Sequence, residues 1–70
     1  MHGHRIQLWR QHRNYTQEQL SYRAGLSLSS VQRIEAGDET RFSALLLVAE
    51  ALEVPIGALL SNDPAPLTLE

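Results

Sequence analysis

The chain has 70 residues, 43% of them hydrophobic, and contains no cysteine. That length allows one small domain with a modest core, and the lack of cysteine excludes a disulfide framework or a thiolate metal site. No apolar run approaches the ~18 residues of a membrane span. The N-terminus also lacks the apolar stretch of a signal peptide, so we expect a cytoplasmic protein that does not contact a membrane.

The charges are divided unevenly along the chain. Residues 1–41 contain all six arginines and four acidic residues, for a formal charge of +2, whereas residues 42–70 contain four acidic residues and no basic one. The net charge of −2 alone would argue against binding to nucleic acid. Its uneven distribution instead predicts a molecule with a basic face and an acidic face.

The spacing of apolar residues predicts a first helix over about residues 4–13. A second helix begins after Thr16, whose side chain can form a capping box with Gln19. Gly25 is expected to end this second helix in a left-handed conformation. Ile6, Trp9 and Arg13 mark one face of the first helix, and Leu20 and Ala24 are expected to face inward on the second.

Three more helices are predicted further along the chain. Ser27 caps the third helix and Gly37 ends it. The segment FSALLLVAEAL predicts a strongly apolar fourth helix, and VPIGALL predicts a short fifth one. The residues expected in the core are Val31 and Ile34 from the third helix and Phe42, Leu45, Leu46, Ala49 and Leu52 from the fourth. Residues 61–70 show no periodicity, so we expect an all-α domain over residues 1–60 followed by a flexible tail.

A turn of about four residues separates the second and third helices, and this arrangement is typical of a helix-turn-helix. The apolar residues expected to fix the angle between the two helices are Leu20, Ala24, Leu26, Val31 and Ile34. The outward face of the third helix carries no acidic residue, so a DNA major groove could accept it. That face consists of Leu28, Ser29, Gln32 and Arg33.

The segment TQEQLSYRAGLSLSSVQRIEAG resembles the Cro/phage-repressor-type helix-turn-helix family, which has the lambda-repressor-like fold. The resemblance covers about residues 5–60, because LLLVAEALEVPIGALL also matches the family's fourth and fifth helices. It implies a compact five-helix domain with the helix-turn-helix as helices two and three. It also implies a bacterial or phage-encoded transcription regulator, a repressor that binds a palindromic operator in double-stranded DNA as a homodimer, without a cofactor.

The resemblance also implies roles for individual residues. The residues implied to read bases are Gln17, Leu28, Ser29, Gln32 and Arg33. The residues expected at the DNA backbone are Thr16, Tyr22, Arg23, Ser30 and Arg41, although Tyr22 could equally well pack on the surface. Arg10 and Glu35 match a pair that joins the first helix to the third by a salt bridge. Glu53 stands where the family commonly has glycine, so a different geometry is expected at the end of the fourth helix.

Apolar side chains late in the chain predict a dimer interface. The residues expected there are Leu47, Val54, Ile56, Leu59 and Leu60. The alternative is that these side chains simply complete the core of the monomer. Isolated exposed leucines are ordinary on protein surfaces, whereas several near one helix end favour an interface.

Two other functional classes can be weighed against DNA-directed regulation. The chain could be an antitoxin-like or accessory protein whose main partner is another protein, with DNA binding secondary. An enzyme is not expected, because the chain has no cysteine nucleophile and no Ser/His/acid set with a spacing that would bring it together. His2 and His4 form an H-x-H pair, but a metal site usually needs at least three ligands, so no metal is expected.

Overall fold

The computed structural model describes residues 3–60, which form helices joined by short turns and contain no strand. The helices are α1 (Gly3–His12), α2 (Gln17–Ala24), α3 (Leu28–Glu35), α4 (Phe42–Leu52) and α5 (Ile56–Leu60). This order confirms the prediction of an all-α domain with five helices. The predicted tail over residues 61–70 lies outside the described residues.

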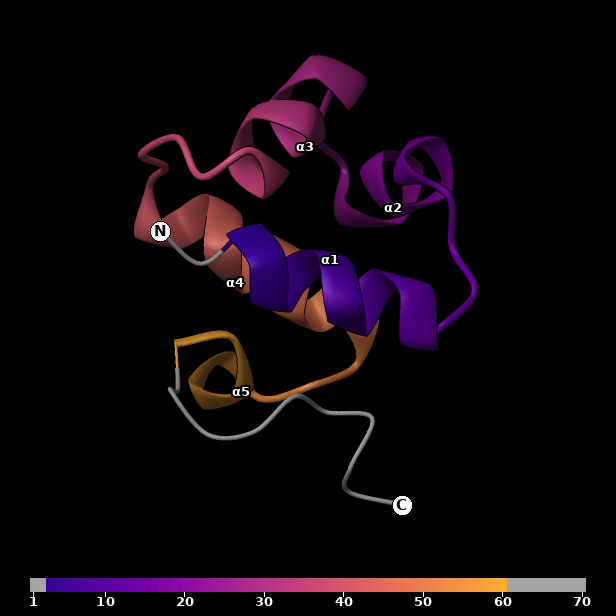
Figure 1. Cartoon of the computed structure of the whole chain (residues 1–70). Coiled ribbons are helices and arrows are strands. Elements are labelled where there is room, and N and C mark those ends of the chain that lie inside the picture. The colour runs from indigo at the N-terminus through magenta and orange to yellow at the C-terminus, as the bar shows by residue number, and fades with distance from the viewer. Residues whose placement is uncertain (1–2, 61–70) are drawn as a thin grey trace.

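The helices pack around α4, which runs behind α1 in Figure 1, with α2 and α3 above the pair and α5 below it. α4 contacts α1, α2 and α5, and α3 packs against α1 and α2. Each helix contributes to one core, whose buried residues are Ile6, Trp9, Leu20, Val31, Ile34, Leu45, Val48, Ala49, Leu52 and Leu59. The longest helix has only 11 residues. Because isolated helices of that length are marginal in water, the shared core must stabilise most of the structure.

The ends of α2 and the start of α3 are fixed by local polar contacts. The Thr16 side chain accepts a hydrogen bond from the Gln19 backbone N–H, and the Gln19 side chain accepts one from the Thr16 N–H. Gly25 follows α2 with a φ of 71°. The Ser27 side chain caps α3 by accepting a hydrogen bond from the Ser30 N–H at 3.1 Å. The predicted capping box, left-handed glycine and serine cap are therefore confirmed.

The end of α4 differs from the expectation. Glu53 has a φ of 61° and a ψ of 43°, the left-handed conformation that glycine usually supplies after a helix. Its N–H donates to the carbonyl oxygens of Ala49 and Glu50. The prediction of a different geometry is therefore wrong, because the backbone keeps the usual cap. A side chain in this conformation costs roughly 1–2 kcal/mol.

Arg13 joins the end of α1 to the end of α4. Its Nε donates to the Leu52 carbonyl oxygen at 2.8 Å, and its Nη2 donates to the Glu53 carbonyl oxygen at 3.3 Å. Its guanidinium also lies 5.7 Å from the ring centre of Trp9. The His12 ring meets the same indole edge-on, with ring centroids 5.7 Å apart. Trp9 is buried, as predicted, and is flanked by these two side chains at the edge of the core.

Gly3 is buried where the start of α1 meets the end of α3. A Cβ atom at this position would lie 2.5 Å from the Ile34 carbonyl oxygen and closer still to that of Glu35. Real Cβ atoms essentially never come so close to a carbonyl oxygen. The absence of a side chain at Gly3 therefore allows the two helices to approach each other this closely.

The inward face of α4 is only partly the one expected. Phe42 is 55% exposed and Leu46 is 44% exposed, so the prediction that both lie in the core is wrong. Val48, which was not expected there, is only 1% exposed. The other three α4 residues predicted to lie in the core, Leu45, Ala49 and Leu52, are buried. Because α4 is apolar on nearly every side, its periodicity cannot fix which face turns inward, and packing against the neighbouring helices decides.

Candidate nucleic-acid interface

A well-anchored turn connects α2 to α3. The Gly25 N–H donates to the carbonyl oxygens of Ser21 and Tyr22. The N–H of Leu26 donates to the Ser21 carbonyl oxygen at 2.9 Å, and the Leu26 side chain packs against the core. Because both the backbone and a side chain of the turn are held, α3 stands at a fixed angle to α2, as a helix-turn-helix requires.

The outward face of α3 is polar and carries no unpaired acid. Its exposed residues are Ser29, Gln32 and Arg33, with Leu28 and Ser30 half-buried at its edges. The only acidic residue of α3 is Glu35, whose side chain is 5% exposed and lies in an ion pair. This face would not repel phosphates, and its hydroxyl and amide groups suit the edges of bases.

Hydroxyl groups cluster at the start of α3. The Ser27 Oγ donates to the Ser30 Oγ at 2.9 Å and lies 3.3 Å from the Ser29 Oγ. The Ser30 hydroxyl is thus engaged with the cap. The Ser29 side chain is exposed and keeps hydrogen-bonding capacity for a further partner.

A largely buried ion pair joins α1 to α3 and extends to α2. Arg10 Nε lies 2.6 Å from Glu35 Oε2, and Arg10 Nη2 donates to Glu35 Oε1 at 3.2 Å. Arg10 Nη1 also donates to the Tyr15 carbonyl oxygen at 2.8 Å. Gln17 Nε2 donates to Glu35 Oε1 at 3.0 Å. The two residues that the resemblance pairs are therefore in contact, and their carboxylate also holds the Gln17 side chain, a contact the sequence did not reveal.

The arginines differ in what they contact. The Arg10 and Arg13 side chains bind within the protein. Arg33 and Arg41 are exposed, and within residues 3–60 neither side chain has a hydrogen-bond or ion-pair partner. Arg23 is also exposed, with its guanidinium 4.6 Å from the centre of a tyrosine ring. Arg23, Arg33 and Arg41 are therefore able to approach phosphates.

The outward side of α2 carries other residues expected at a DNA backbone. Tyr22 is 89% exposed, so it does not pack on the described surface and its hydroxyl is accessible. Thr16 is exposed at the start of α2. Its hydroxyl oxygen accepts the capping hydrogen bond, and its O–H remains able to donate to another group.

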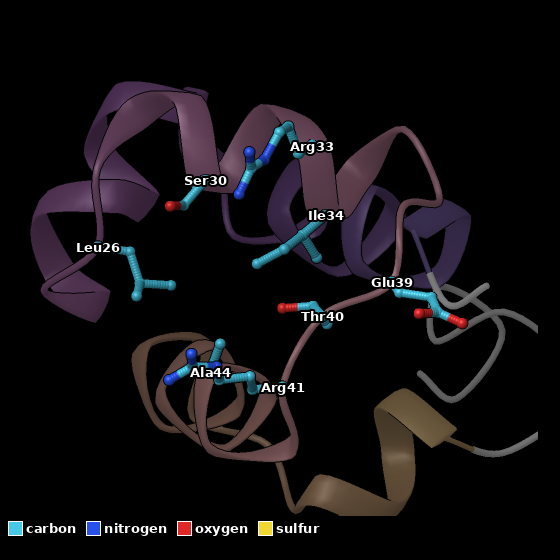
Figure 2. Close-up of a pocket in the computed structure, with 8 residues that line it drawn as sticks. All are labelled: Leu26, Ser30, Arg33, Ile34, Glu39, Thr40, Arg41 and Ala44. Atoms are coloured by element: carbon cyan, nitrogen blue, oxygen red, sulfur yellow. The ribbon is translucent and has the colours of Figure 1, made fainter.

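A hollow of about 540 Å³ lies between α3 and the start of α4 (Figure 2). Its lining residues are Leu26, Ser30, Arg33, Ile34, Glu39, Thr40, Arg41 and Ala44. Figure 2 shows Arg33 on the α3 wall beside Ser30, and Arg41 on the opposite wall beside Ala44. The structure therefore brings Arg33 together with Arg41, which the sequence did not predict.

A second, smaller hollow of about 230 Å³ lies on the other edge of α3, against the start of α2. Its lining residues are Thr16, Gln17, Glu18, Leu28 and Gln32. The outward face of α3 therefore has two edges. Gln32 and Leu28 border α2, whereas Arg33 and Ser30 border α4. Helical geometry places Ser29 between these two edges.

The predicted dimer surface loses one residue. Leu59 is 0% exposed and belongs to the core, so the prediction that it lies in a dimer interface is wrong. The reason is that Leu59 is the residue with which the short helix α5 packs into the core. Leu47 is 41% exposed and Leu60 36% exposed, and Val54 and Ile56 are half-buried. These four residues remain accessible to a second copy of the chain.

Residues 3–60 contain neither a cluster of metal ligands nor a membrane-spanning helix. In that range no group of three His, Asp or Glu side chains could hold a metal ion. None of the helices described is long and apolar enough to cross a membrane. His4 is exposed, and His2 lies outside the described residues.

Comparison with known protein families matches residues 6–59 to the helix-turn-helix family. The matched range covers the core of the domain and both helices of the motif. Comparison with curated proteins and with solved structures finds no match. The family match agrees with the anchored α2–α3 turn and the acid-free outward face of α3. The chain therefore belongs to the helix-turn-helix family of the Cro/repressor type and is a DNA-binding transcription regulator.

Proposed function

We propose that this regulator is a repressor that binds a palindromic operator as a homodimer, with α3 in the major groove. The observation that supports this proposal best is the outward face of α3, which is exposed, free of unpaired acids and held at a fixed angle by its turn. A B-DNA major groove about 12 Å wide admits an α-helix. Such a repressor would act in the cytoplasm of a bacterium.

In this proposal, the bases are read mainly by the edge of α3 that borders α2. The Gln32 carboxamide can bond an adenine through two hydrogen bonds, and Leu28 can contact a thymine methyl group. Ser29 lies between the two edges, where its hydroxyl can reach several bases. Gln17, held by Glu35, would touch the first base of the half-site.

Backbone contacts would set the position of α3 in the groove. Thr16, Tyr22 and Arg23 would contact phosphates on the α2 side. Ser30 and Arg41 would do so on the α4 side. Such contacts carry no sequence information directly, but they fix register and orientation on the duplex. They also make the affinity fall as salt concentration rises.

Dimerisation would supply the second half-site. A single domain of this size buries roughly 600–1,000 Å² of protein surface on DNA, which rarely gives operator affinity alone. The surface proposed for the dimer consists of Leu47, Val54, Ile56 and Leu60. A two-fold dimer predicts a palindromic operator whose half-site centres lie about 34–36 Å apart, one turn of the DNA helix.

Selection of bound sequences from random duplex DNA tests the function directly. The expected result is one enriched motif with two-fold symmetry and half-sites one helical turn apart. An enriched but asymmetric single site would contradict the homodimer. Absence of any enriched motif would contradict sequence-specific binding.

Two neighbouring leucines of α4 test the dimer surface. Leu47 and Leu46 are similarly exposed, at 41% and 44%, but only Leu47 belongs to the proposed interface. Leu47→Glu should convert the dimer to a monomer in sedimentation, because a two-fold interface brings two copies of the new charge together. Leu46→Glu should leave the dimer intact. A folded Leu47→Glu variant that remains dimeric would exclude this surface.

A second candidate function is that of an accessory protein with a protein partner. It is favoured by Phe42 and Leu46, an exposed apolar pair outside the proposed dimer surface. Phe42 also lines a hollow of about 470 Å³ together with Asp38, Glu39 and Leu60, so it adjoins the proposed dimer surface at Leu60. Phe42→Ser should release such a partner in a copurification experiment while operator binding persists. Copurification that is unaffected by this change would remove the reason for this second function.

A further inference from the structure

We propose that Arg33 and Arg41 together hold one DNA backbone phosphate in the hollow between α3 and α4. Arg33 would then position the protein on DNA rather than read a base. The proposal rests on the proposed DNA-binding function and assigns one of its phosphate contacts to these two arginines. It departs from the family pattern, which places a base-reading residue at position 33.

The first argument is the place of Arg33 on its helix. Arg33 lies on the edge of α3 that borders α4, while Gln32 and Leu28 lie on the edge that borders α2. Of these two edges, only the one with Arg33 faces a second exposed arginine, Arg41, which is itself expected at the DNA backbone. The position of Arg33 beside Arg41, rather than beside Gln32 and Leu28, therefore points to a backbone contact.

The second argument is the charge of the hollow. Arg33 and Arg41 stand on opposite walls, and among residues 3–60 neither guanidinium has an ion-pair or hydrogen-bond partner. Two cations that face one concave space repel each other until an anion lies between them. A guanidinium presents a planar set of donors that matches the oxygens of a phosphate. One phosphate can therefore bind the guanidinium groups of Arg33 and Arg41 at the same time.

One acidic residue, Glu39, also lines the hollow and would oppose an anion there. It forms no ion pair with either arginine. In Figure 2 its carboxylate is directed away from both guanidinium groups, while the Thr40 side chain points into the space between them. The hydroxyl of Thr40 can add a hydrogen bond to a phosphate oxygen. The cationic and hydroxyl side of the hollow is thus separate from its acidic end.

The proposal has a consequence for specificity. If both arginines bind a phosphate, base discrimination belongs to the other edge of α3 and to Gln17. Loss of Arg33 should then weaken binding to every duplex by a similar factor. Loss of a guanine contact would instead relax the choice at one base pair of each half-site.

The experiment uses the full chain and the duplex recovered by selection. Each phosphate of one half-site is replaced in turn by a neutral methylphosphonate, and binding is measured for the unaltered protein, Arg33→Ala and Arg41→Ala. The unaltered protein should lose affinity about tenfold or more at each contacted phosphate. Sensitivity at one and the same position should fall in both variants, because each keeps one of the two arginines, and it should be lost when both arginines are replaced. Both arginines are exposed, so circular dichroism should show that the variants fold normally.

Arg23→Ala is the matched control, because Arg23 is an exposed arginine on α2, outside this hollow. It should remove sensitivity at a different phosphate. The Arg33→Ala/Arg41→Ala double variant gives a second readout. If the two arginines share one phosphate, the magnitude of the slope of log affinity against log salt should fall by about 0.9 per half-site. If they contact two separate phosphates, the slope should fall by about twice that amount, and this result would overturn the proposal.

Three other results would also overturn it. The first is a selection profile of Arg33→Ala that loses preference at one base pair while every phosphate stays sensitive. The second is tight, saturable binding of inorganic phosphate to the protein without DNA, followed through the arginine side-chain N–H signals, which would assign the hollow to a free phosphate compound. The third is an unaltered protein that binds no duplex, which would overturn the proposed function and this proposal with it.

Discussion

The segment from α1 to α3 and the segment from α4 to α5 are held in place by different interactions. The first segment contains a capping box, a serine cap and a largely buried ion pair that reaches all three of its helices. α4 begins at Phe42, its N-cap residue Arg41 makes no side-chain capping bond, and the helix is placed mainly by four buried apolar residues. The comparison teaches that polar contacts fix helix ends and angles in the part that would face DNA, whereas the part expected to dimerise is placed mainly by burial, with Arg13 adding hydrogen bonds only at the end of α4.

This difference matches the demands on each segment. A recognition helix must be held within a narrow range of positions to align hydrogen bonds with base edges, and directional contacts do this well. An apolar surface for a second copy needs shape and burial more than exact direction. The predictions below test whether the first segment depends on its polar and close contacts, and whether α4 depends on the burial of particular faces.

The largest effect is expected from Glu35→Ala. It would leave the Arg10 guanidinium, whose side chain is 12% exposed, without its carboxylate partner. Breaking a fully buried pair lowers the free energy of unfolding by about 3–5 kcal/mol, and this largely buried pair should approach the lower end of that range. Chemical denaturation at a fixed protein concentration measures it. Glu39→Ala, which removes an exposed acid without an ion pair, is the control and should change stability little. Equal stability of the two variants would show that the ion pair does not hold the first segment together.

Gly3→Ala should have the next largest effect. The added Cβ would overlap the carbonyl oxygens at the end of α3 and force α1 to move. Overpacking of this kind costs about 1–3 kcal/mol, and each kcal/mol lowers Tm by roughly 4–8 °C in a domain of this size. Gly57→Ala is the matched control, because no atom lies within 4 Å of the added Cβ, and it should raise Tm slightly. A Gly3→Ala variant that melts like the unaltered chain would show that α1 and α3 are not in close contact.

A smaller effect, of opposite sign, is expected at the end of α4. Glu53→Gly relieves a side chain at a φ of 61°. The relief is partly offset because glycine gives the unfolded chain more freedom, so the net gain should be about 0.5–1 kcal/mol. Thermal melting would show it as a higher Tm. A lower Tm would mean that the Glu53 side chain makes a favourable contact that outweighs its backbone strain.

The smallest effect is expected from Phe42→Ser. The sequence places Phe42 in the core, where truncating a phenylalanine costs about 3–5 kcal/mol. The structure leaves it 55% exposed, so the free energy of unfolding should change by at most about 0.5–1 kcal/mol. Val48→Ala, at a fully buried position of the same helix, should cost clearly more. A larger loss of stability for Phe42→Ser than for Val48→Ala would show that α4 turns Phe42 toward the core, as the sequence predicted.

The sequence predicted the helix ends around the turn because the chemistry at each end lies within a few residues. Thr16 reaches Gln19, and Ser27 reaches Ser30, each three positions along the chain. Gly25 needs only its own backbone conformation. Such local signals can be read without knowing where the rest of the chain lies.

What the sequence did not predict depends on distant parts of the chain. Gly3 is constrained by carbonyl oxygens at the end of α3. Leu59 enters the core because α5 folds back onto α4. The pairing of Arg33 with Arg41 across one hollow depends on the angle between α3 and α4. Spacing along a single helix contains none of this information.

Trp9 provides a built-in optical signal. It is the only tryptophan of the chain, and it is buried at the junction of α1 with the end of α4, where Arg13 and His12 flank its ring. Its fluorescence should shift to longer wavelength when that junction opens and water reaches the indole. Because Trp9 is buried on α1, away from the outward face of α3, the emission should change little when DNA binds. Unfolding and operator binding can therefore be followed in one sample, the first through Trp9 and the second through a dye on the DNA.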